Sequence, residues 1–566
     1  MQNRVLDQNY RLSSNFYKSD EVLQHYLHTR LSVRSLAVFS ASISQLGQKA
    51  AAELNEYSQL ADKFGPQLKK RNFYGDNIDE IVFHPAYAKM LDIAVASQML
   101  RLKWEPDLRS RYDGERHKMG FAAGFLFSMS ESGLYCPLCM TDGVALLIDK
   151  YCNEADKQRL LPRIYTDVAA ELYTGAMFLT EKTGGSDVGA NLVTATHIKE
   201  DLWYLNGEKW FCSNANAEII FVLARTKAEI KGTKGLGIFL LEPKLPDGAS
   251  NGMELLRLKD KLGTRSMASG EYIFNNAVAK LVGGETEGFK IMTDMINLSR
   301  LYNSVAAIAG MRRAIVEAYQ FLSFRNSFGK NVLEHALPRV KLQELGAIYL
   351  GNFYLTWRAI EALDAAESGD ADEAELLRVL TPMAKKSSAE TAVYAVREAM
   401  ELMGGMGYIE DGVMPKIMRD VMVLPIWEGA GNIMILDMLR AAVKSKGLGI
   451  IFAEIETEFE SATVSLYLNE ENWQKIITHF MSLKALIGQL QNEAQDIMET
   501  TAKIAFERLS KYYQLSCLLR YYDEDSAKWI GPAIAYYSDV VLNNNASELK
   551  APPSLEKIKN LLAWDF

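Results

Sequence analysis

Three long stretches with helical periodicity, all between residues 288 and 440, constrain the fold of this chain most strongly. They cover 289–325, 339–366 and 373–403, and apolar residues recur in each of them at spacings of three and four. The first stretch carries a single interior glycine, Gly310. Amphipathic helices of this length bury their apolar stripes against one another, so the pattern predicts an antiparallel helical bundle.

The segment before this bundle has a different texture, which begins near residue 176. Residues 203–213 alternate apolar and polar side chains around Asn206-Gly207, a pair that favours a tight turn, so we predict a β-hairpin there. Three further runs have the composition of strands: 218–226, 235–243 and 270–279. A small all-β domain is therefore expected between the helical parts.

The remaining parts of the chain are helical in pattern, so the predicted fold class is α+β. The predicted domains are an N-terminal helical domain (1–175), a central β domain (176–285), a helical bundle (286–444) and an additional C-terminal helical region (445–566).

The composition excludes several classes of protein. The 566 residues carry a net charge of −9, which argues against a surface that coats nucleic acid. No apolar run approaches the ~18 residues of a membrane helix, and the polar start of the chain lacks the core of a signal peptide, so a cytoplasmic location is expected. The five cysteines are expected to be free thiols. The lone CxxC at Cys136 and Cys139 has no second pair or nearby histidines, so we predict no metal site.

Glu428 is the only charged residue between Asp420 and Asp437, and its neighbours in "VLPIWEGAGNIMILDML" are mostly apolar. A carboxyl group without a charged partner in such surroundings tends to raise its pKa, as a catalytic base often requires. The ordinary alternative is a loop residue that points to water. This segment alone does not distinguish the two.

Four other segments could contact a ligand: 178–190 ("FLTEKTGGSDVGA"), 209–214 ("KWFCSN"), 324–330 ("FRNSFGK") and 401–412 ("ELMGGMGYIEDG"). Paired glycines let a backbone approach a ligand closely, and Thr and Ser hydroxyl groups can donate to it. Strand alternation would place Phe211 and Ser213 on one face, and Arg325 could bind phosphate. The alternatives are a plain loop, a core strand, a solvated cation at a helix end and a glycine cap.

Taken in order, the segments resemble one family, the flavin-dependent acyl-CoA dehydrogenases. The resemblance covers roughly residues 85–440 and rests on "TEKTGGSDV", "KWFCSN", "KDKLGTRSMAS", "RNSFGK", "ELMGGMGY", "MRD" and "IWEGAGN". The chain is most similar to the AidB-like branch, through "RNFYGDNIDEIVFHPAY" and the helical extension beyond residue 445. The resemblance implies an N-terminal helical domain, a central β domain and a helical bundle, commonly assembled as a homotetramer.

The resemblance also implies an FAD cofactor and a role for each matching residue. In the sheet part, the flavin would be met by Thr180, Gly185, Ser186, Phe211 and Ser213. The FAD of a neighbouring subunit would be met by Arg325, Phe328, Gly404 and Gly405. The flavin and acyl site would be lined by Trp427, Gly429 and Asn432, and Glu428 occupies the position of the family's catalytic base.

A member of this family would act in fatty acid metabolism. Glu428 would remove the α-proton of an acyl-CoA thioester while the β-hydride passes to flavin N5, giving a 2-enoyl thioester. Donors to the thioester oxygen would stabilise the enolate. An electron-transfer flavoprotein would be the expected electron acceptor.

The chain departs from the family pattern at four positions. Ala336 and Glu401 replace glutamines that help to hold the neighbour's FAD, and Ala430 replaces a threonine near the flavin. Ser299 stands where some relatives carry a second glutamate, which leaves Glu428 as the only candidate base.

Three functions therefore remain open: a dehydrogenase, an FAD-containing acyl-chain or acyl-CoA binder with little turnover, and an AidB-like alkylation-response protein that associates with DNA. DNA association is disfavoured because residues 441–566 hold 12 basic and 17 acidic side chains.

Overall fold

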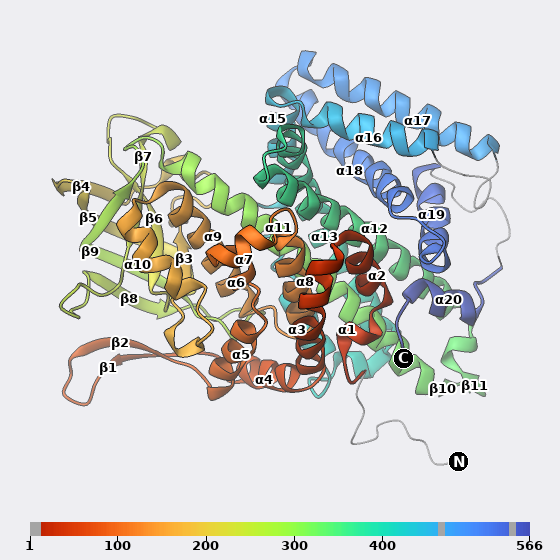
Figure 1. Cartoon of the computed structure of the whole chain (residues 1–566), viewed down its shortest axis with the longest axis horizontal. Helices are drawn as coiled ribbons and strands as arrows, with labels where there is room; N and C mark the ends of the chain where they lie inside the picture. The colour runs from red at the N-terminus through yellow and green to blue at the C-terminus, as the bar shows by residue number, and fades with distance from the viewer. Residues whose placement is uncertain (1–12, 462–469, 543–550) are drawn as a thin grey trace. The chain divides into compact units, whose positions relative to one another are not determined.

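The computed structural model describes residues 13–461, 470–542 and 551–566, and it divides into two compact units (Figure 1). The first, here called the bundle unit, comprises Met1–Ala52, Asp113–Met129 and Asn303–Phe566. The second, the sheet unit, comprises Glu53–Tyr112 and Ser130–Tyr302. Each unit is continuous in space although its segments are far apart in the sequence. The four-domain division expected from the sequence stays a prediction.

The three long helical stretches form three long helices, as predicted. They are α11 (Gly288–Phe324), α12 (Ala336–Glu367) and α13 (Ala371–Leu402). Helices α12 and α13 pack side by side in the bundle unit (Figure 1). Their packed faces bury large apolar side chains completely, among them Leu350, Phe353, Trp357, Leu376 and Leu380. Burial of such side chains supplies most of the stability of long helices.

Shorter helices complete the bundle unit. Those before the long helices are α1 (Phe16–Ser19), α2 (Glu21–Arg30), α3 (Val33–Ala51) and α8 (Arg116–Ser128). A small hairpin, β10 (Asn326–Ser327) and β11 (Lys330–Asn331), and the turn η4 (Val332–Glu334) join α11 to α12. After α13 come η5 (Gly404–Tyr408), α14 (Met414–Val421) and α15 (Gly431–Lys444).

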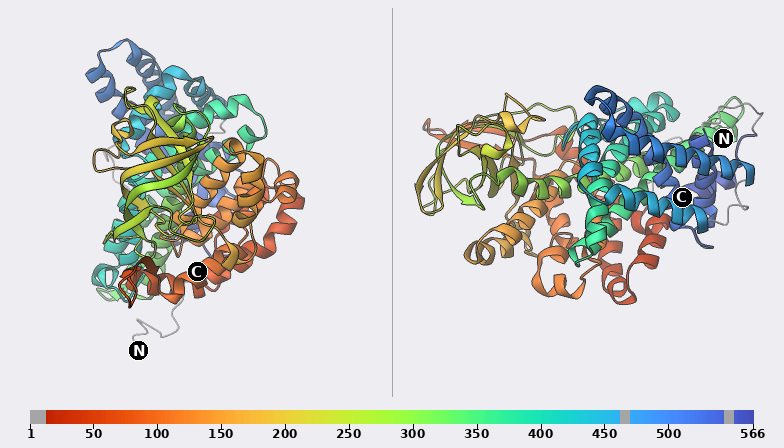
Figure 2. Two further views of the ribbon diagram at one scale, coloured as in Figure 1. Left: turned by 90° about the vertical axis from the view of Figure 1, so that its left-hand side faces the viewer. Right: turned by 90° about the horizontal axis from the view of Figure 1, so that it is seen from above.

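The C-terminal extension consists of helices that pack on the bundle. They are α16 (Gly447–Ser461), α17 (Glu470–Gln489), η7 (Leu490–Asn492), α18 (Gln495–Arg520), α19 (Ala527–Leu542) and α20 (Leu555–Leu562). Helices α16, α17 and α18 lie beside one another, as Figures 1 and 2 show.

A buried ionic network joins this extension to α12 and α13. The guanidinium group of Arg358 on α12 is 2% exposed and lies 2.7 Å from Glu373 and 2.6 Å from Glu454 of α16. Gln514 of α18 is also buried and donates to Asn352 and Ser387 at 3.0 and 2.8 Å. Because buried polar groups are costly without partners, these contacts make the extension part of the core.

The sheet unit is built around one seven-stranded sheet. Its strands are β3 (Gly175–Phe178), β4 (Thr194–Lys199), β5 (Leu202–Ser213), β6 (Ile219–Arg225), β7 (Leu236–Leu241), β8 (Met253–Leu258) and β9 (Ser269–Val282). The order is β3-β6-β4-β5-β9-β7, and a further pairing of β6 with β7 closes the sheet into a barrel. The left view of Figure 2 looks onto these strands. Their inward side chains form one apolar core, which includes Phe178, Leu205, Cys212, Val222 and Phe239.

The predicted hairpin turn at Asn206-Gly207 is wrong. Strand β5 continues through both residues, and the pairing with β9 shifts register between Leu205 and Gly207, which is the signature of a β-bulge. Gly207 has φ +131°, and a Cβ atom there would approach Val193 to 3.0 Å. Glycine is therefore required by a close approach inside the barrel rather than by a chain reversal.

The helices of the sheet unit pack around this barrel. They are α4 (Glu53–Lys63), α5 (Pro85–Ala96), α6 (Arg101–Trp104), α7 (Pro106–Arg111), α9 (Tyr135–Tyr151) and α10 (Glu154–Ile164), with short turns η1 (Ala169–Glu171), η2 (Val188–Ala190) and η3 (Thr233–Gly235). A two-stranded ribbon, β1 (Gln67–Arg71) and β2 (Asn77–Val82), interrupts the helices and was not predicted from the sequence.

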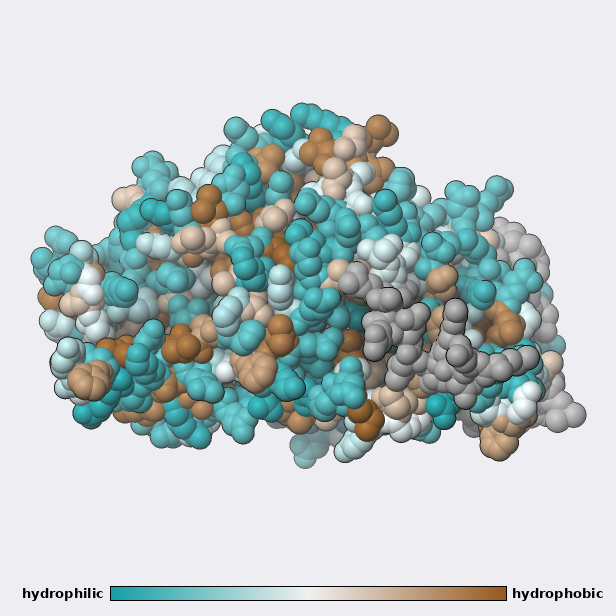
Figure 3. All heavy atoms as spheres, turned by 90° about the horizontal axis from the view of Figure 1, so that it is seen from below, coloured by the Kyte–Doolittle hydropathy of each residue, from teal (hydrophilic) through white to brown (hydrophobic). Residues whose placement is uncertain are grey.

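No helix among the described residues is long and apolar enough to cross a membrane. The face shown in Figure 3 is largely hydrophilic, with apolar residues scattered between charged ones.

Candidate active site

Loop 179–193 of the sheet unit is anchored by a buried ion pair. The ammonium group of Lys209 on β5 is completely buried and donates to Glu181 at 2.7 Å and to the carbonyl of Leu179 at 3.1 Å. Glu181 also accepts from the backbone N–H groups of Leu192 and Val193, so one carboxylate ties both ends of the loop together. Burial lowers the pKa of Lys209, while the charge and hydrogen bond of Glu181 favour its protonated form.

The anchored loop lies against β5 at the candidate aromatic residues. The N–H of Trp210 donates to the carbonyl of Thr180 at 2.9 Å. A Cβ atom on Gly185 would lie 3.4 Å from the Thr180 methyl group, so Thr180 and Gly185 are neighbours. A register shift between Lys209 and Cys212 bends β5 at this place.

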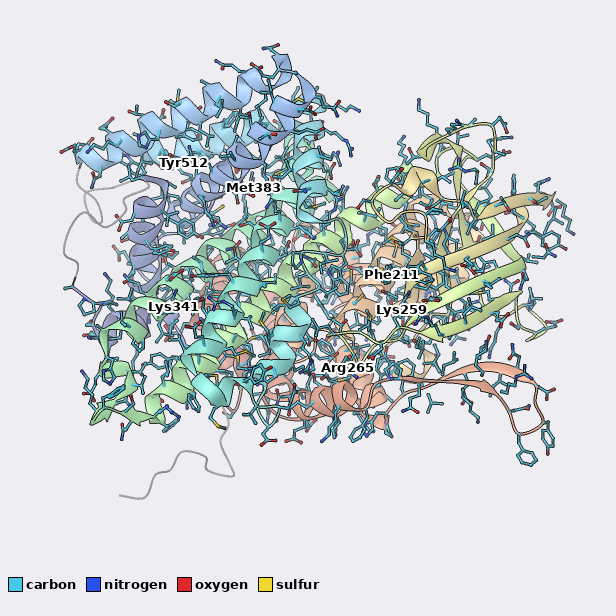
Figure 4. The ribbon with its side chains drawn as sticks, turned by 180° about the vertical axis from the view of Figure 1, so that it is seen from behind. Phe211, Lys259, Arg265, Lys341, Met383 and Tyr512 are labelled. Atoms are coloured by element: carbon cyan, nitrogen blue, oxygen red, sulfur yellow. The ribbon has the colours of Figure 1, made fainter. Side chains whose placement is uncertain are left out.

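Phe211 presents its ring to the surface of the sheet unit. The residue is 56% exposed, whereas Cys212 is fully buried and Ser213 is half-buried, so alternation places Phe211 and Ser213 on the outer face. The ammonium group of Lys259 lies 3.4 Å from the centre of the Trp210 ring and 4.6 Å from that of Phe211 (Figure 4). The two rings are nearly perpendicular, with an angle of 77° between their planes, and the cation lies beside both of them.

Three hydroxyl groups of the neighbouring segments are available to bind a ligand. Among the described residues, the side chains of Thr180, Ser186 and Ser213 make no hydrogen bond. Ser186 is exposed and Thr180 is half-buried. These hydroxyl groups can therefore serve as donors to the polar edge of a flat heterocycle.

Loop 423–430 of the bundle unit carries Glu428, which is half-buried. Its backbone is left-handed, with φ +55°, and Gly429 follows with φ +98°. A left-handed non-glycine residue is strained and persists only where its surroundings fix it. The indole N–H of Trp427 donates to the side-chain oxygen of Asn303, and the carbonyl of Gly429 accepts from the buried ammonium group of Lys385 on α13 at 2.6 Å.

The loop ends where α15 begins. Ala430 is the N-cap residue and provides no side-chain hydrogen bond to the helix. The exposed Asn432 follows in the first turn. This helix end therefore lacks the hydroxyl or amide oxygen that usually satisfies its first N–H groups.

The remaining candidate residues lie at two further places in the bundle unit. Arg325 follows the end of α11, and Phe328 with Gly329 forms the two-residue turn between β10 and β11, both with positive φ. Phe328 is 96% exposed. Gly404 and Gly405 follow α13, and a Cβ atom on either would meet nothing within 4 Å. Both places leave open space beside the backbone.

The structure thus brings the predicted residues together in separate sets. Within the sheet unit, Thr180, Gly185 and Phe211 adjoin the same loop and strand. Within the bundle unit, Trp427, Glu428 and Gly429 share one loop, whereas Arg325, Phe328, Gly404 and Gly405 belong to other segments.

Comparisons with known proteins match three parts of the chain. Residues 8–168 match the N-terminal domain of adaptive response protein AidB, 176–277 the middle domain of acyl-CoA dehydrogenases and 286–443 their C-terminal domain. The putative acyl-CoA dehydrogenase AidB of Escherichia coli (strain K12) is 34% identical over 455 residues, which cover 79% of this chain and 81% of that protein. The chain belongs to the acyl-CoA dehydrogenase family. Its place in the AidB-like branch is confirmed as well.

Solved structures of family members show the same fold. The crystal structure of Caenorhabditis elegans ACDH-11 in complex with C11-CoA has a TM-score of 0.89 and 25% identity, and the match covers 97% of this chain and 94% of that one. An acyl-CoA dehydrogenase of Bacillus anthracis complexed with FAD has a TM-score of 0.71 at 16% identity, with 99% of this chain and 97% of that one covered. The predicted architecture of helical domain, β domain and helical bundle with an extension is confirmed.

The departures from the family pattern have visible structural consequences. Glu401 forms a 2.7 Å ion pair with Arg397 one turn earlier on α13. Ala336 is exposed at the start of α12, and Ala430 leaves α15 without a side-chain cap. Ser299 is buried and donates to the carbonyl of Ile296, so it is no second base.

Sequence reasoning missed three lysines of the candidate active site: Lys209, Lys259 and Lys385. Lysine is usually exposed, so its identity alone gives no signal of burial. The only available hints were the position of Lys209 beside Trp210 on a strand and that of Lys385 after the apolar pair Met383-Ala384.

Proposed function

We propose that this protein is an FAD-dependent acyl-CoA dehydrogenase in which Glu428 is the catalytic base. The observation that carries the proposal is the placement of this carboxyl group. In a chain of this family, it stands in an apolar loop, on strained left-handed backbone, with the next carbonyl held by a buried lysine. Strain of this kind clusters at functional sites.

The residues of the sheet unit fit a flavin. Phe211 would cover the ring system, and the uncommitted hydroxyl groups of Thr180, Ser186 and Ser213 would donate to its polar edge. Gly185 would allow the close approach of the backbone. When bound, FAD would supply the acceptor for the substrate's β-hydride.

The residues of the bundle unit would have the roles that the family resemblance implies. Trp427, Gly429 and Asn432 would line the acyl and flavin site. Contacts to the FAD of a neighbouring subunit would come from Arg325, Phe328, Gly404 and Gly405. Phe328 is 96% exposed at the tip of its turn, so its ring would be accessible to a neighbouring subunit in the homotetramer that we propose with these contacts.

The chemistry of this chain's own residues follows from their positions. The Glu428 carboxylate would take the α-proton of an acyl-CoA thioester, and the apolar neighbours of the loop would exclude water that competes for the proton. The negative charge that develops on the thioester oxygen would be stabilised by a backbone N–H donor, that of Glu428 itself. The product would be a 2-enoyl thioester, and an electron-transfer flavoprotein would receive the electrons.

A panel of acyl-CoA thioesters tests the proposal. The purified protein should be yellow, and anaerobic mixing with a substrate should bleach the oxidised flavin. Glu428→Gln should retain FAD and lose bleaching by at least ~100-fold, because general bases contribute about 10²–10⁴-fold. Bleaching at the wild-type rate would refute the assignment of the base.

Two other functions are supported by particular observations. The changes at Ala336, Glu401 and Ala430 favour a binder with little turnover, for which acyl-CoA would shift the flavin spectrum without bleaching it. The AidB-like alternative, an alkylation-response role with DNA association, agrees with the match to the N-terminal domain of an adaptive response protein and requires a salt-dependent mobility shift. The acidic balance of residues 441–566 weighs against the latter.

A further inference from the structure

Lys385 is a fully buried lysine that contacts the loop of the candidate base. It lies in the middle of α13 with 0% of its surface exposed. Its ammonium group donates to the carbonyl oxygen of Gly429 at 2.6 Å. Lysine is almost never fully buried, since removal of the charge from water is costly, so this contact calls for an explanation.

The contact falls at the place where loop 423–430 most needs a restraint. Glu428 and Gly429 are both left-handed, which costs of order 1–3 kcal/mol for a residue with a side chain. The carbonyl that Lys385 holds belongs to the residue directly after Glu428. One residue further on, Ala430 gives α15 no side-chain cap. A hydrogen bond to the Gly429 carbonyl therefore fixes the peptide between Gly429 and Ala430, directly after the left-handed pair.

We propose that Lys385 is a positioning residue for Glu428. It holds the backbone of loop 423–430 in the left-handed conformation from which the carboxylate reaches the α-carbon of the substrate. The inference rests on the proposed role of Glu428 as the base. Reacting groups must be held to within a fraction of an ångström, and displacement by about 1 Å can cost about 100-fold in rate.

The adjacent residue, Lys386, provides a matched control. It is on the same helix and is also buried, at 7% exposure. Because successive positions on a helix point about 100° apart, its ammonium group has other partners. These are Glu390 at 2.6 Å and Glu507 of α18 at 3.0 Å. Figure 4 marks this region by Met383, two residues before Lys385 on α13, and by Tyr512 on α18.

The experiment compares Lys385→Met with Lys386→Met in the full-length protein with its flavin. Methionine keeps the length of the side chain and removes the donor. In Lys385→Met, flavin content and acyl-CoA affinity should stay the same, while the limiting rate of flavin reduction falls about 10- to 100-fold. Amide hydrogen exchange in the peptide 423–433 should become faster. Lys386→Met should change the limiting rate by no more than about 2-fold, since its ammonium group binds Glu390 and Glu507 rather than the Gly429 carbonyl.

Each result decides the proposal. A reduction rate in Lys385→Met equal to that of the wild type, or an equal loss in Lys386→Met, would overturn it. If no acyl-CoA reduces the wild-type flavin, the proposed function fails, and hydrogen exchange alone then tests whether Lys385 restrains the loop. Should Lys385→Met not fold, Lys385→Gln keeps an N–H donor, and its limiting rate should lie between those of wild type and Glu428→Gln. A wild-type rate in Lys385→Gln together with unchanged exchange would also contradict the proposal.

Discussion

Loop 179–193 of the sheet unit and loop 423–430 of the bundle unit are both held by a buried lysine, but the lysines contact different chemical groups. Lys209 pairs with the carboxylate of Glu181, which itself accepts from two backbone N–H groups of the loop. Lys385 donates to the backbone carbonyl of Gly429. The first arrangement ties both ends of a long loop through an ion pair, whereas the second fixes one peptide group. We therefore expect that substitution of Lys209 lowers the stability of the fold, whereas substitution of Lys385 changes the position of loop 423–430.

The largest effect is expected from Lys209→Met. The substitution leaves the Glu181 carboxylate buried without its cation, which typically costs about 3–5 kcal/mol. Urea unfolding and flavin content measure the loss. The control is Lys182→Met, because Lys182 pairs with Glu208 at the surface and such pairs contribute about 0–1 kcal/mol. If both variants lost the same stability, the ion pair would not be the anchor of loop 179–193.

A second contrast concerns Gly184 in loop 179–193 and Gly431, the first residue of α15. A Cβ atom on Gly184 would lie 2.7 Å from the backbone oxygen of Asp187, so Gly184→Ala should distort the loop and cost about 1–3 kcal/mol. A Cβ atom on Gly431 would lie 2.6 Å from Glu390 Oε1, the end of a flexible and half-exposed side chain. Gly431→Ala should therefore cost little. Differences in thermal unfolding temperature compare the two variants, and an equal loss in both would contradict this reading of the backbone contact.

The smallest expected effect is an increase in the stability of the fold. Ala430→Thr would place a hydroxyl group at the N-cap of α15, where Ser, Thr, Asp and Asn commonly stabilise a helix by about 1 kcal/mol relative to Ala. Ala430→Val has a similar shape without the hydroxyl group and serves as the control. A rise in unfolding temperature that is equal in both variants would show that packing, not capping, is responsible.

The sequence was sufficient to predict the long helices and the strands β6, β7 and β9, because their patterns are local. The apolar spacing of 289–325 defines a helix whatever lies around it. The bulge at Asn206-Gly207 could not be recognised from the sequence, because the residue that Gly207 approaches closely is Val193, directly before β4. The ribbon β1–β2 was not predicted because most of its side chains are polar and exposed, and its burial alternates only between exposed and half-buried positions.

In the candidate site, too, features that depend on local sequence could be predicted, and features that depend on distant partners could not. Glu428 stands out in the sequence because a carboxylate among apolar residues is unusual. Lys209 and Lys385 do not stand out, since their burial depends on partners 28 and 44 positions away in the chain. Motifs therefore reveal the groups that would contact ligand more readily than the groups that hold them in place.

The way in which Arg358 bridges α12, α13 and α16 bears on how this branch of the family could gain or lose its C-terminal helices. In a chain that ended at residue 444, the Arg358 guanidinium would lose its partner Glu454, and the apolar surface that α18 covers would be exposed to water. The C-terminal extension is therefore an integral part of the fold. Such a truncation should yield an insoluble product rather than a minimal enzyme.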